Sequence, residues 1–402
     1  MWTRRWMCSA MMSVLLSVGV CAAQDHDHHA HPAPKAKSGE GMPFAHLTDD
    51  GRLHLVFVSD TDGVKRVRYR QLFGDAPVES AISAPEEKLS HWPESPPKVE
   101  VTRDGAIHVL YTVRVSSKEG EGAPVELRYS FSNDGGNTWA APAVVGDATA
   151  ALYRSCASMR EDANGALVLS WLEAVPASGT VGVRTATRKG DSFDFVMYDD
   201  KACECCATEL LRARDGTMWL GYRDVDTSNV RDMYLARMTP EADRFGPAAR
   251  ISRDRWVVPG CPDTGPRFAL APEDAVWAAW YSGNPRGIYA ARANVTAPQF
   301  AARELVQGAD DHVSSLAHPA IGTLPDGRPV VAYECKRDEV DRLEGRVRGG
   351  SGWGETIQLG DKGEYPRIAT NGKETYLVYT AITDGGKSIA VRDLAEIIPG
   401  NR

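Results

Sequence analysis

A short pattern of polar and apolar residues recurs seven times along the chain. Each copy starts at a two-residue turn, mostly Asp-Gly or Asn-Gly, and continues as a run of apolar and β-branched residues that ends at an aromatic ring. Such a pattern predicts a hairpin turn that leads into a buried strand. The seven copies are Asp50–Phe57, Asp104–Tyr111, Asn164–Trp171, Asp215–Tyr222, Glu273–Trp280, Asp326–Tyr333 and Asn371–Tyr379.

Each repeat is long enough for four short strands. One strand precedes the turn, as in Pro266–Leu270, a third follows the buried strand, as in Val125–Ser132, and a fourth follows an aromatic residue such as Trp139. Repeats of this size without helical periodicity predict an all-β fold, a β-propeller of four-stranded blades. We expect seven blades. Six is the alternative, in which the first and last units share a blade, because no fourth strand is evident after the last copy.

The stretch SNDGGNTW, residues 132–139, carries a longer motif. An Asp can accept backbone N–H groups in such a turn, glycines adopt positive φ, and the Trp can pack between blades. The stretch resembles the Asp-box of the sialidase-like (BNR repeat) β-propellers, and Thr187–Phe193 and Arg348–Trp353 look like degenerate copies. The resemblance implies a structural turn between the third and fourth strands, on the face opposite the ligand site. The matching residues are Ser132, Asp134, Gly136, Thr138 and Trp139.

The first residues of the chain predict export. Arg4 and Arg5 precede an apolar run and small residues, so residues 1–23 read as a signal peptide cleaved after Ala23. The apolar run is too short for a membrane span. Residues 24–41 are rich in His and Pro and are expected to form a disordered arm, either a solvated tail or a metal scavenger. Residues 42–398 form the predicted propeller domain, placed in the periplasm or outside the cell.

Charge excludes one class of partner. Without the leader, which holds two arginines and no acidic residue, the formal net charge falls from −8 to about −10. An acidic exported protein is a poor match for nucleic acid, whose phosphates require a basic face. The remaining partners are a small ligand, a metal ion or a glycan at the mouth of the central channel, or another protein.

Six cysteines remain beyond the leader, and they gather at one kind of position. Each lies on a connection that enters an innermost strand, or directly after a second strand. These positions open on the same face of a propeller, around the mouth of its channel. The cysteines are Cys156, Cys203, Cys205, Cys206, Cys261 and Cys335.

Two structural interpretations of these cysteines stay open. In an oxidising compartment they can form disulfides between neighbouring connections, for example Cys156 with the CECC segment or Cys206 with Cys261, which would make a braced scaffold. Alternatively, the thiolates form a metal site with His312 and His318 as further ligands. Soft ligands of this kind suit copper(I) first and zinc(II) second. Our leading hypothesis is a binding propeller that handles copper.

A glycosidase is the alternative function. The CECC and GCPDTGP segments also resemble a group of bacterial exported sialidase-like proteins. In the sialidase-like enzymes, the resemblance implies three arginines that clamp a carboxylate and a Tyr nucleophile paired with a Glu. The Arg-Ile-Pro motif of that family is not found, since Gly41 stands where its Arg belongs. The substitute candidates, which could equally form ion pairs across the channel, are Arg154, Arg267, Arg367, Tyr365 and Glu204.

Overall fold

The computed structural model describes residues 39–74, 76–115, 124–146, 153–296, 299–308, 313 and 315–398. The predicted signal peptide, most of the predicted arm and His312 lie outside the described residues. The first strand begins at Gly39, so the propeller includes the last three residues of the segment expected to be arm. Among the described residues, no helix has the length and apolar character needed to cross a membrane.

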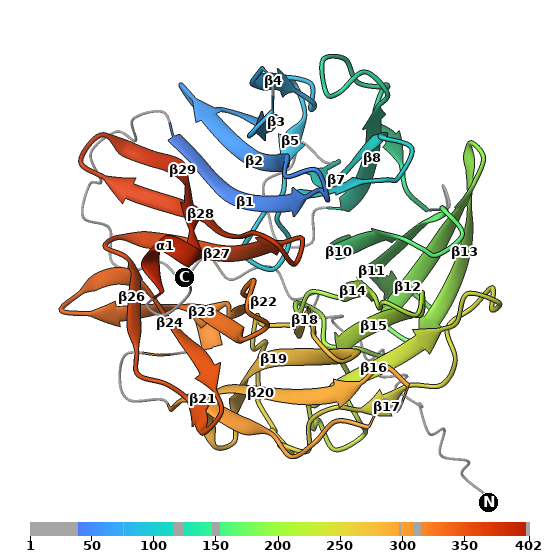
Figure 1. The fold of residues 1–402 in the computed structure, drawn as a ribbon. Coiled ribbons are helices and arrows are strands. Elements are labelled where there is room, and N and C mark those ends of the chain that lie inside the picture. Colours follow the sequence, from blue (N-terminus) through green and yellow to red (C-terminus); the bar gives the residue numbers. More distant parts are fainter. Residues whose placement is uncertain are drawn as a thin grey trace, which may run out of the picture.

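Seven antiparallel sheets are arranged in a ring, as Figure 1 shows along the central axis. Within a sheet the chain runs from an inner strand outward, strand by strand. The first three blades contain β1 (Gly39–Leu47), β2 (Leu53–Thr61), β3 (Val64–Leu72) and β4 (Val78–Ala81); β5 (Lys88–Leu89), β6 (Lys98–Val101), β7 (Ile107–Arg114), β8 (Val125–Ser132) and β9 (Ala143–Val144); and β10 (Arg154–Glu161), β11 (Leu167–Val175), β12 (Thr180–Lys189) and β13 (Ser192–Asp199).

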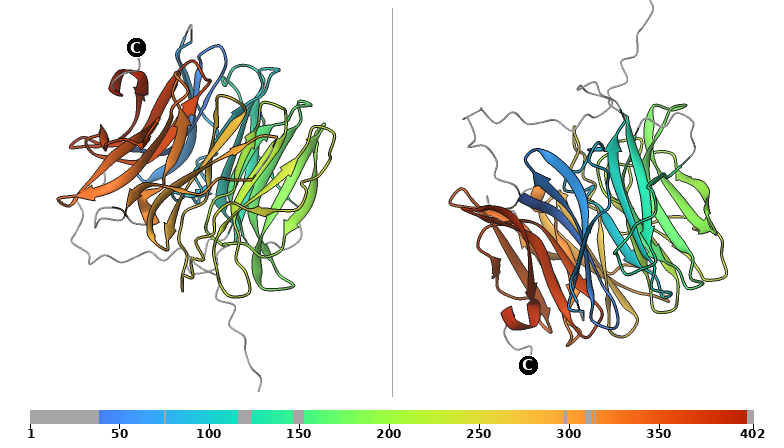
Figure 2. Two further views of the ribbon diagram at one scale, coloured as in Figure 1. Left: turned by 60° about the horizontal axis from the view of Figure 1, so that its bottom comes forward. Right: turned by 90° about the horizontal axis from the view of Figure 1, so that it is seen from above.

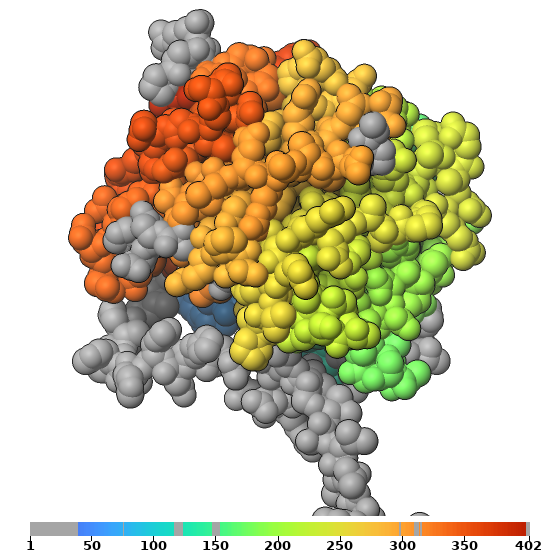
Figure 3. Space-filling model, turned by 90° about the horizontal axis from the view of Figure 1, so that it is seen from below, coloured from blue at the N-terminus to red at the C-terminus, as the bar shows by residue number. Residues whose placement is uncertain are grey.

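The remaining blades continue around the ring, and Figure 3 shows blades four to six side by side along the rim. They contain β14 (Glu209–Arg212), β15 (Met218–Arg223), β16 (Met233–Met238) and β17 (Ala249–Arg250); β18 (Arg267–Ala271), β19 (Ala275–Gly283), β20 (Arg286–Asn294) and β21 (Glu304–Gly308); β22 (Ala320–Thr323), β23 (Pro329–Arg337), β24 (Val340–Gly349), β25 (Gly352–Trp353) and β26 (Ile357–Gly360); and β27 (Gly363–Thr370), β28 (Thr375–Thr383) and β29 (Gly386–Asp393), followed by α1 (Leu394–Ile397). A short 3-10 helix, Ser315–Ala317, precedes β22.

The ring closes by side-by-side packing of the first and last blades rather than by a shared sheet. β1 pairs with β2 in its own sheet, whereas β27, β28 and β29 form a separate three-stranded sheet. Across the junction, the N–H of Met42 donates to Thr380 Oγ1 at 3.2 Å, and the N–H of Ile389 donates to Glu40 Oε2 at 3.1 Å. Seven blades are therefore confirmed, and the shared blade of the six-blade alternative is wrong. The side views in Figure 2 show the flat disc that results.

The aromatic residues that end the second strands fill the spaces between blades, as the repeat predicts. Tyr111, Trp171 and Tyr222 are fully buried, as are their counterparts in most other blades. Two buried histidines sit at equivalent places in β2 and β7, where His54 and His108 each hydrogen-bond a tyrosine hydroxyl at 2.7 Å. Burial lowers the pKa of both imidazoles to about 4, so they are neutral core residues.

The Asp-box is confirmed as a structural turn between β8 and β9. Asp134 Oδ1 accepts the N–H of Thr138 at 2.9 Å, and Ser132 Oγ accepts the N–H of Gly136 at 2.9 Å. The indole of Trp139 reaches the preceding blade, where its N–H donates to Ser80 Oγ at 2.9 Å and its ring meets Tyr69 edge-on. These contacts fasten blade two to blade one.

We predict that two neighbouring glycines of this turn differ in their tolerance of a side chain. Gly135 and Gly136 both have positive φ, 73° and 89°. A Cβ on Gly135 would meet nothing within 4 Å, whereas a Cβ on Gly136 would lie 2.2 Å from the Tyr69 ring. Gly135→Ala should therefore lower the free energy of unfolding by about 1–2 kcal/mol through backbone strain alone. Gly136→Ala should lower it by roughly a further 1–3 kcal/mol through overpacking.

Denaturant unfolding of the two variants provides the measurement, with Gly135→Ala as the matched control. Equal destabilisation of both variants would show that the turn does not press against the preceding blade.

Candidate functional site at the channel mouth

The inner strands carry a recurrent irregularity at the mouth of the channel. In blades one, three and seven the pairing of the inner strand is interrupted at Met42, Cys156 and Tyr365, and these residues have φ of 53°, 54° and 57°. His318 and Asp263, which precede inner strands, also have positive φ. Bulges with left-handed residues re-aim side chains and are frequent near functional sites. The mouth is therefore the region of the described structure where we look for function.

Four cysteines gather at this face, between the connections that enter blades four and five. Cys205 and Cys261 form a disulfide, and their Cα atoms lie 6.3 Å apart. The sulfur atoms of Cys203, Cys205 and Cys261 lie within 4.8 Å of one another. Cys206 Sγ lies 3.1 Å from Cys203 Sγ, and both are free thiols. We call Cys203, Cys205, Cys206 and Cys261 the cysteine cluster.

Polar neighbours make Cys203 different from the other thiols of the cluster. Arg231 Nη1 donates to Cys203 Sγ at 3.2 Å and to Glu204 Oε2 at 3.0 Å. Burial alone would raise the pKa of the Cys203 thiol, but the hydrogen bond from Cys206 and the charges of Arg231 and Arg223 outweigh it and lower the pKa. Burial and the neighbouring Cys203 raise the pKa of Cys206. Cys203 is therefore the thiol of this pair that ionises more readily.

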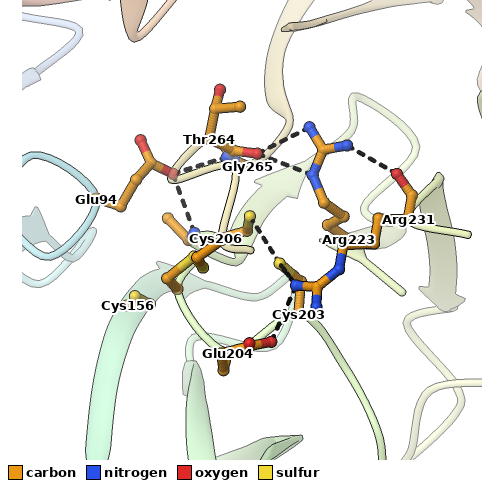
Figure 4. Close-up of a disulfide and its surroundings, with 12 residues drawn as sticks. Glu94, Cys156, Cys203, Glu204, Cys206, Arg223, Arg231, Thr264 and Gly265 are labelled. Atoms are coloured by element: carbon orange, nitrogen blue, oxygen red, sulfur yellow. Dashed lines mark hydrogen bonds and ion pairs between the residues drawn. A yellow bond between two sulfur atoms is a disulfide. The ribbon is translucent and has the colours of Figure 1, made fainter. Parts of the chain in front are cut away.

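The carboxylate of Glu94 holds the two cysteine-bearing connections together. Its Oε2 accepts the N–H of Ala207, next to Cys206, at 3.0 Å and the N–H of Gly265 at 2.7 Å, and its Oε1 pairs with Arg267 at 2.7 Å. Figure 4 shows Glu94 facing both connections. Burial alone would raise the pKa of Glu94, but Arg267, His318, Arg367 and the Gly265 N–H hold it below its usual value. The buried carboxylate is therefore an anion that positions the cluster.

Arg223 is a second residue that links the two cysteine-bearing connections. Its fully buried guanidinium donates to the carbonyl oxygens of Thr264, Arg231 and Tyr281 at 2.8–3.1 Å. Its own carbonyl oxygen accepts the N–H of Cys203 at 2.9 Å. Since Thr264 lies on the connection that carries Cys261, Arg223 joins both halves of the cysteine cluster, as Figure 4 shows.

The other predicted metal ligands lie apart from the cluster or beside it. Cys156 is a buried free thiol whose carbonyl oxygen accepts the N–H of Thr208, next to the CECC segment, and burial raises its pKa. Cys335 is a free thiol in β23, buried in the core between blades five and six, where burial and Glu344 raise its pKa to about 12. His318 Nδ1 lies 3.2 Å from Glu334 and belongs to a different group of residues. Of the eight predicted ligands, the structure thus brings Cys203, Cys205, Cys206 and Cys261 together, and His312 lies outside the described residues.

The disulfide prediction is confirmed in kind, since a bridge joins two neighbouring connections. The pairing is Cys205–Cys261, not either of the pairings offered as examples.

Charged residues on four inner strands lie behind the mouth, and Lys98, Arg267 and Arg367 are buried whereas Glu209 is partly buried. Lys98, Glu209, Arg267 and Arg367 occupy equivalent register positions, each opposite the residue that precedes the aromatic end of its second strand. Burial, and then the charge of Arg267, lower the pKa of Arg367 to about 10. The two arginines share the segment around Glu94, since Arg267 pairs with the Glu94 carboxylate at 2.7 Å and Arg367 Nη2 donates to the Pro93 carbonyl oxygen at 2.9 Å.

The structure divides the candidate glycosidase residues among separate groups. Arg154 Nε pairs with Glu173 at 2.9 Å, and both side chains are buried. Glu204 pairs with Arg231 at the cysteine cluster. Tyr365 has Glu334 as its carboxylate neighbour instead, because Glu334 Oε1 accepts the Tyr365 N–H at 2.6 Å. Burial raises the pKa of Tyr365 above its usual value, which opposes formation of a phenolate nucleophile.

Three residues that position the site are not evident from the pattern of the sequence. Glu94 and Lys98 are the two charged residues of the segment SHWPESPPK, which leads into an inner strand. Arg231 lies in RDMY, directly before a third strand. A charged residue next to a predicted inner strand is the one available signal, and it does not reveal which partner the charge meets.

Comparison with known proteins bears on the fold. No model of a known protein family matches the sequence, and no curated protein matches it. Among solved structures, a Hadza microbial sialidase superposes with a TM-score of 0.52 at 12% identity, over 87% of this chain and 78% of that one. A protein of unknown function from Dyadobacter fermentans gives 0.53 at 13%, over 89% and 94%. The GH93 α-L-arabinofuranosidase of Fusarium graminearum gives 0.51 at 15%, over 77% and 98%.

The protein therefore has the fold of the sialidase-like β-propellers, as the Asp-box indicates. Identities this low show the common fold and leave the chemistry of the mouth to be argued from its own residues.

We predict that Glu94→Ala destabilises the protein and loosens the cysteine cluster. Removing one partner of a buried ion pair leaves Arg267 and two N–H groups unsatisfied, so the free energy of unfolding should fall by about 3–5 kcal/mol. Glu79→Ala, which removes an exposed partner of Arg70, is the control and should cost less than about 1 kcal/mol. Iodoacetamide should label Cys206 faster in the Glu94 variant only. Unchanged labelling would contradict a positioning role for Glu94.

The same carboxylate predicts a pH dependence. Because the pKa of Glu94 is lower in the folded protein than the ordinary glutamate value of 4.5, its stabilisation is complete above about pH 4.5 and is lost as the pH falls through the folded-state pKa. The difference in unfolding free energy between wild type and Glu94→Ala should therefore shrink in acid. A difference that grows in acid would contradict an ionised Glu94.

Proposed function

We propose that this protein is an exported binding propeller whose cysteine cluster holds a soft metal ion, copper(I) first and zinc(II) second. The observation that supports this function is the convergence of four cysteines from two connections on one point at the channel mouth. Thiolate sulfur is a ligand that favours copper(I) and zinc(II) over harder cations.

The number of available thiolates depends on the disulfide. With Cys205–Cys261 bonded, Cys203 and Cys206 offer two sulfurs, which suits the low coordination numbers of copper(I). With the disulfide reduced, four sulfurs are available, which suits tetrahedral zinc(II). Arg231 beside Cys203 favours the anionic sulfur that a metal requires.

Two features of the sequence support an exported metal-handling role. Residues 1–23 have the layout of a signal peptide, and His26, His28, His29 and His31 lie in the segment that precedes the propeller. Imidazoles bind copper and zinc with low specificity when they are clustered in a flexible segment. The arm would capture the ion, and the cysteine cluster would retain it.

A glycosidase acting on acidic sugars is the second candidate. Tyr365 lies at the mouth with positive φ, next to Glu334, and the buried Arg367 follows it by two residues. The structural neighbours named above include a sialidase and an arabinofuranosidase. Against this function, Arg154 and Arg267 are bound to Glu173 and Glu94.

For the metal function we predict that the chain from residue 24 onward, purified without reductant so that the Cys205–Cys261 bond is kept and then held anaerobic, retains about one copper(I) against a chromophoric competitor chelator. Cys203→Ser should lower the affinity by roughly tenfold or more, because one of the two nearest sulfurs is lost. Cys335→Ser removes a buried thiol elsewhere and is the matched control. Deletion of residues 24–38, which stops before β1, should leave the stoichiometry of the propeller unchanged. Equal affinities of the two serine variants would contradict the site.

For the second candidate, a fluorogenic sialoside is the substrate to test. Turnover by the wild-type protein that is abolished in Tyr365→Phe, with an unchanged melting temperature, would establish glycosidase activity. If only the binding function is present, both proteins should leave the sialoside intact.

A further inference from the structure

The CECC segment contains a second motif that metal binding does not require. Cys203 and Cys206 are the first and last residues of a C-x-x-C sequence, the spacing of redox-active dithiols. Their sulfur atoms lie 3.1 Å apart. Cys205, between them, is bonded to Cys261. A dithiol of this spacing therefore stands directly against an existing disulfide.

The distances allow the dithiol and the disulfide to react. The sulfur of Cys203 lies within 4.8 Å of both sulfurs of the Cys205–Cys261 bond. Arg231 is 3.2 Å from Cys203 Sγ and stabilises negative charge there, and Arg223 fixes the backbone N–H of the same residue. Thiol–disulfide exchange requires a thiolate in contact with a disulfide sulfur. Within the cluster, Cys203 is the free thiol that groups with both disulfide sulfurs, all within 4.8 Å of one another, so a short movement of its side chain would bring it into contact.

We propose that the cysteine cluster is a thiol–disulfide exchange centre in which Cys203 and Cys206 take over the disulfide of Cys205 and Cys261. This activity goes beyond metal binding, although it uses the same sulfur atoms. It needs no metal and no external oxidant.

The exchange has two steps. In the first, the Cys203 thiolate attacks Cys205 Sγ, forming a Cys203–Cys205 bond and releasing Cys261 as a thiolate. In the second, the Cys206 thiolate attacks Cys203 Sγ, forming Cys203–Cys206 and releasing Cys205. The two thiol protons of Cys203 and Cys206 end on Cys205 and Cys261, and the number of disulfides stays at one throughout.

Differences in burial make Cys261 the cysteine of this centre that a partner protein can reach. Cys203 and Cys206 are essentially buried and Cys205 is 9% exposed, whereas Cys261 lies on the surface side of the cluster and is only partly buried. An external dithiol protein would attack Cys261 Sγ, and its two thiols would become a disulfide as Cys205 and Cys261 become thiols. In the Cys203–Cys206 form the disulfide is buried. In the Cys205–Cys261 form it is accessible to the partner at Cys261.

Tryptic digestion separates the two disulfide forms cleanly. Cleavage after Lys201 and Arg212 yields the peptide 202–212, which contains three cysteines of the cluster, and cleavage after Arg255 and Arg267 yields 256–267 with Cys261. The Cys205–Cys261 form gives these two peptides cross-linked. The Cys203–Cys206 form gives them separate, with an internal disulfide in 202–212 and an alkylated Cys261.

The experiment uses the chain from residue 24 onward, purified without reductant and incubated with a metal chelator in mildly alkaline buffer. Samples are quenched in acid, alkylated and mapped by mass spectrometry. We expect both forms in the wild-type protein. Cys206→Ser should stop at the mixed disulfide of Cys203, and Cys203→Ser should remain cross-linked through Cys205, with the release of Cys261 slowed by roughly tenfold or more. Cys335→Ser, the control, should match wild type.

Two results would overturn the proposal. One is a wild-type protein that keeps only the Cys205–Cys261 bond, and the other is undiminished release of Cys261 in Cys203→Ser. If Cys203→Ser does not fold, two other results still test the proposal. These are the change of disulfide in the wild-type protein and the Cys203–Cys205 bond that should accumulate in Cys206→Ser. The chelator removes copper and zinc, so the exchange assay does not depend on metal binding. Exchange in this assay together with no copper retention in the titration would mean that the metal function fails and the exchange function stands.

Discussion

The buried carboxylate of Glu94 is the interaction on which the geometry of the mouth depends. It comes from the connection into blade two, yet it binds the backbone of the connections into blades four and five and the side chain of Arg267. An anion at this depth is stable only because charged donors and N–H groups surround it. Through it, the packing of three blades determines where the cysteines meet.

The channel behind Glu94 places like charges near one another, which a stable core would avoid. Lys98 is almost completely buried, and burial lowers its pKa to about 7, despite the opposing charge of Glu209. Arg367 keeps its charge beside Arg267 with a pKa of about 10. Buried ionic groups of this kind add little net stability and hold a defined arrangement. The ring of charges thus orients the mouth rather than strengthening the fold.

The two faces of the propeller differ in the contacts that form them. The Asp-box face holds neighbouring blades through short, local turns, since Ser132, Asp134 and Thr138 bond within a few residues of one another. The mouth is built from connections that are far apart in sequence, and it carries residues with positive φ, free thiols and the disulfide. A motif as long as SNDGGNTW therefore reports the fold, and the function is argued from the opposite face.

Local patterns were sufficient to predict the blades and the Asp-box turn, because turn residues and strand periodicity act over a few positions. The repeat also predicted that Cys203, Cys205, Cys206 and Cys261 gather at the mouth, whereas Cys335, expected after a second strand, lies within β23 in the core. The sequence did not determine which cysteines meet: the bonded pair is 56 residues apart, and its choice depends on Glu94, Arg223 and Arg231 from other connections. Only the packing of the blades brings those charges together, so the tertiary structure decided the disulfide, the separate places of Cys335 and His318, and the division of the arginines.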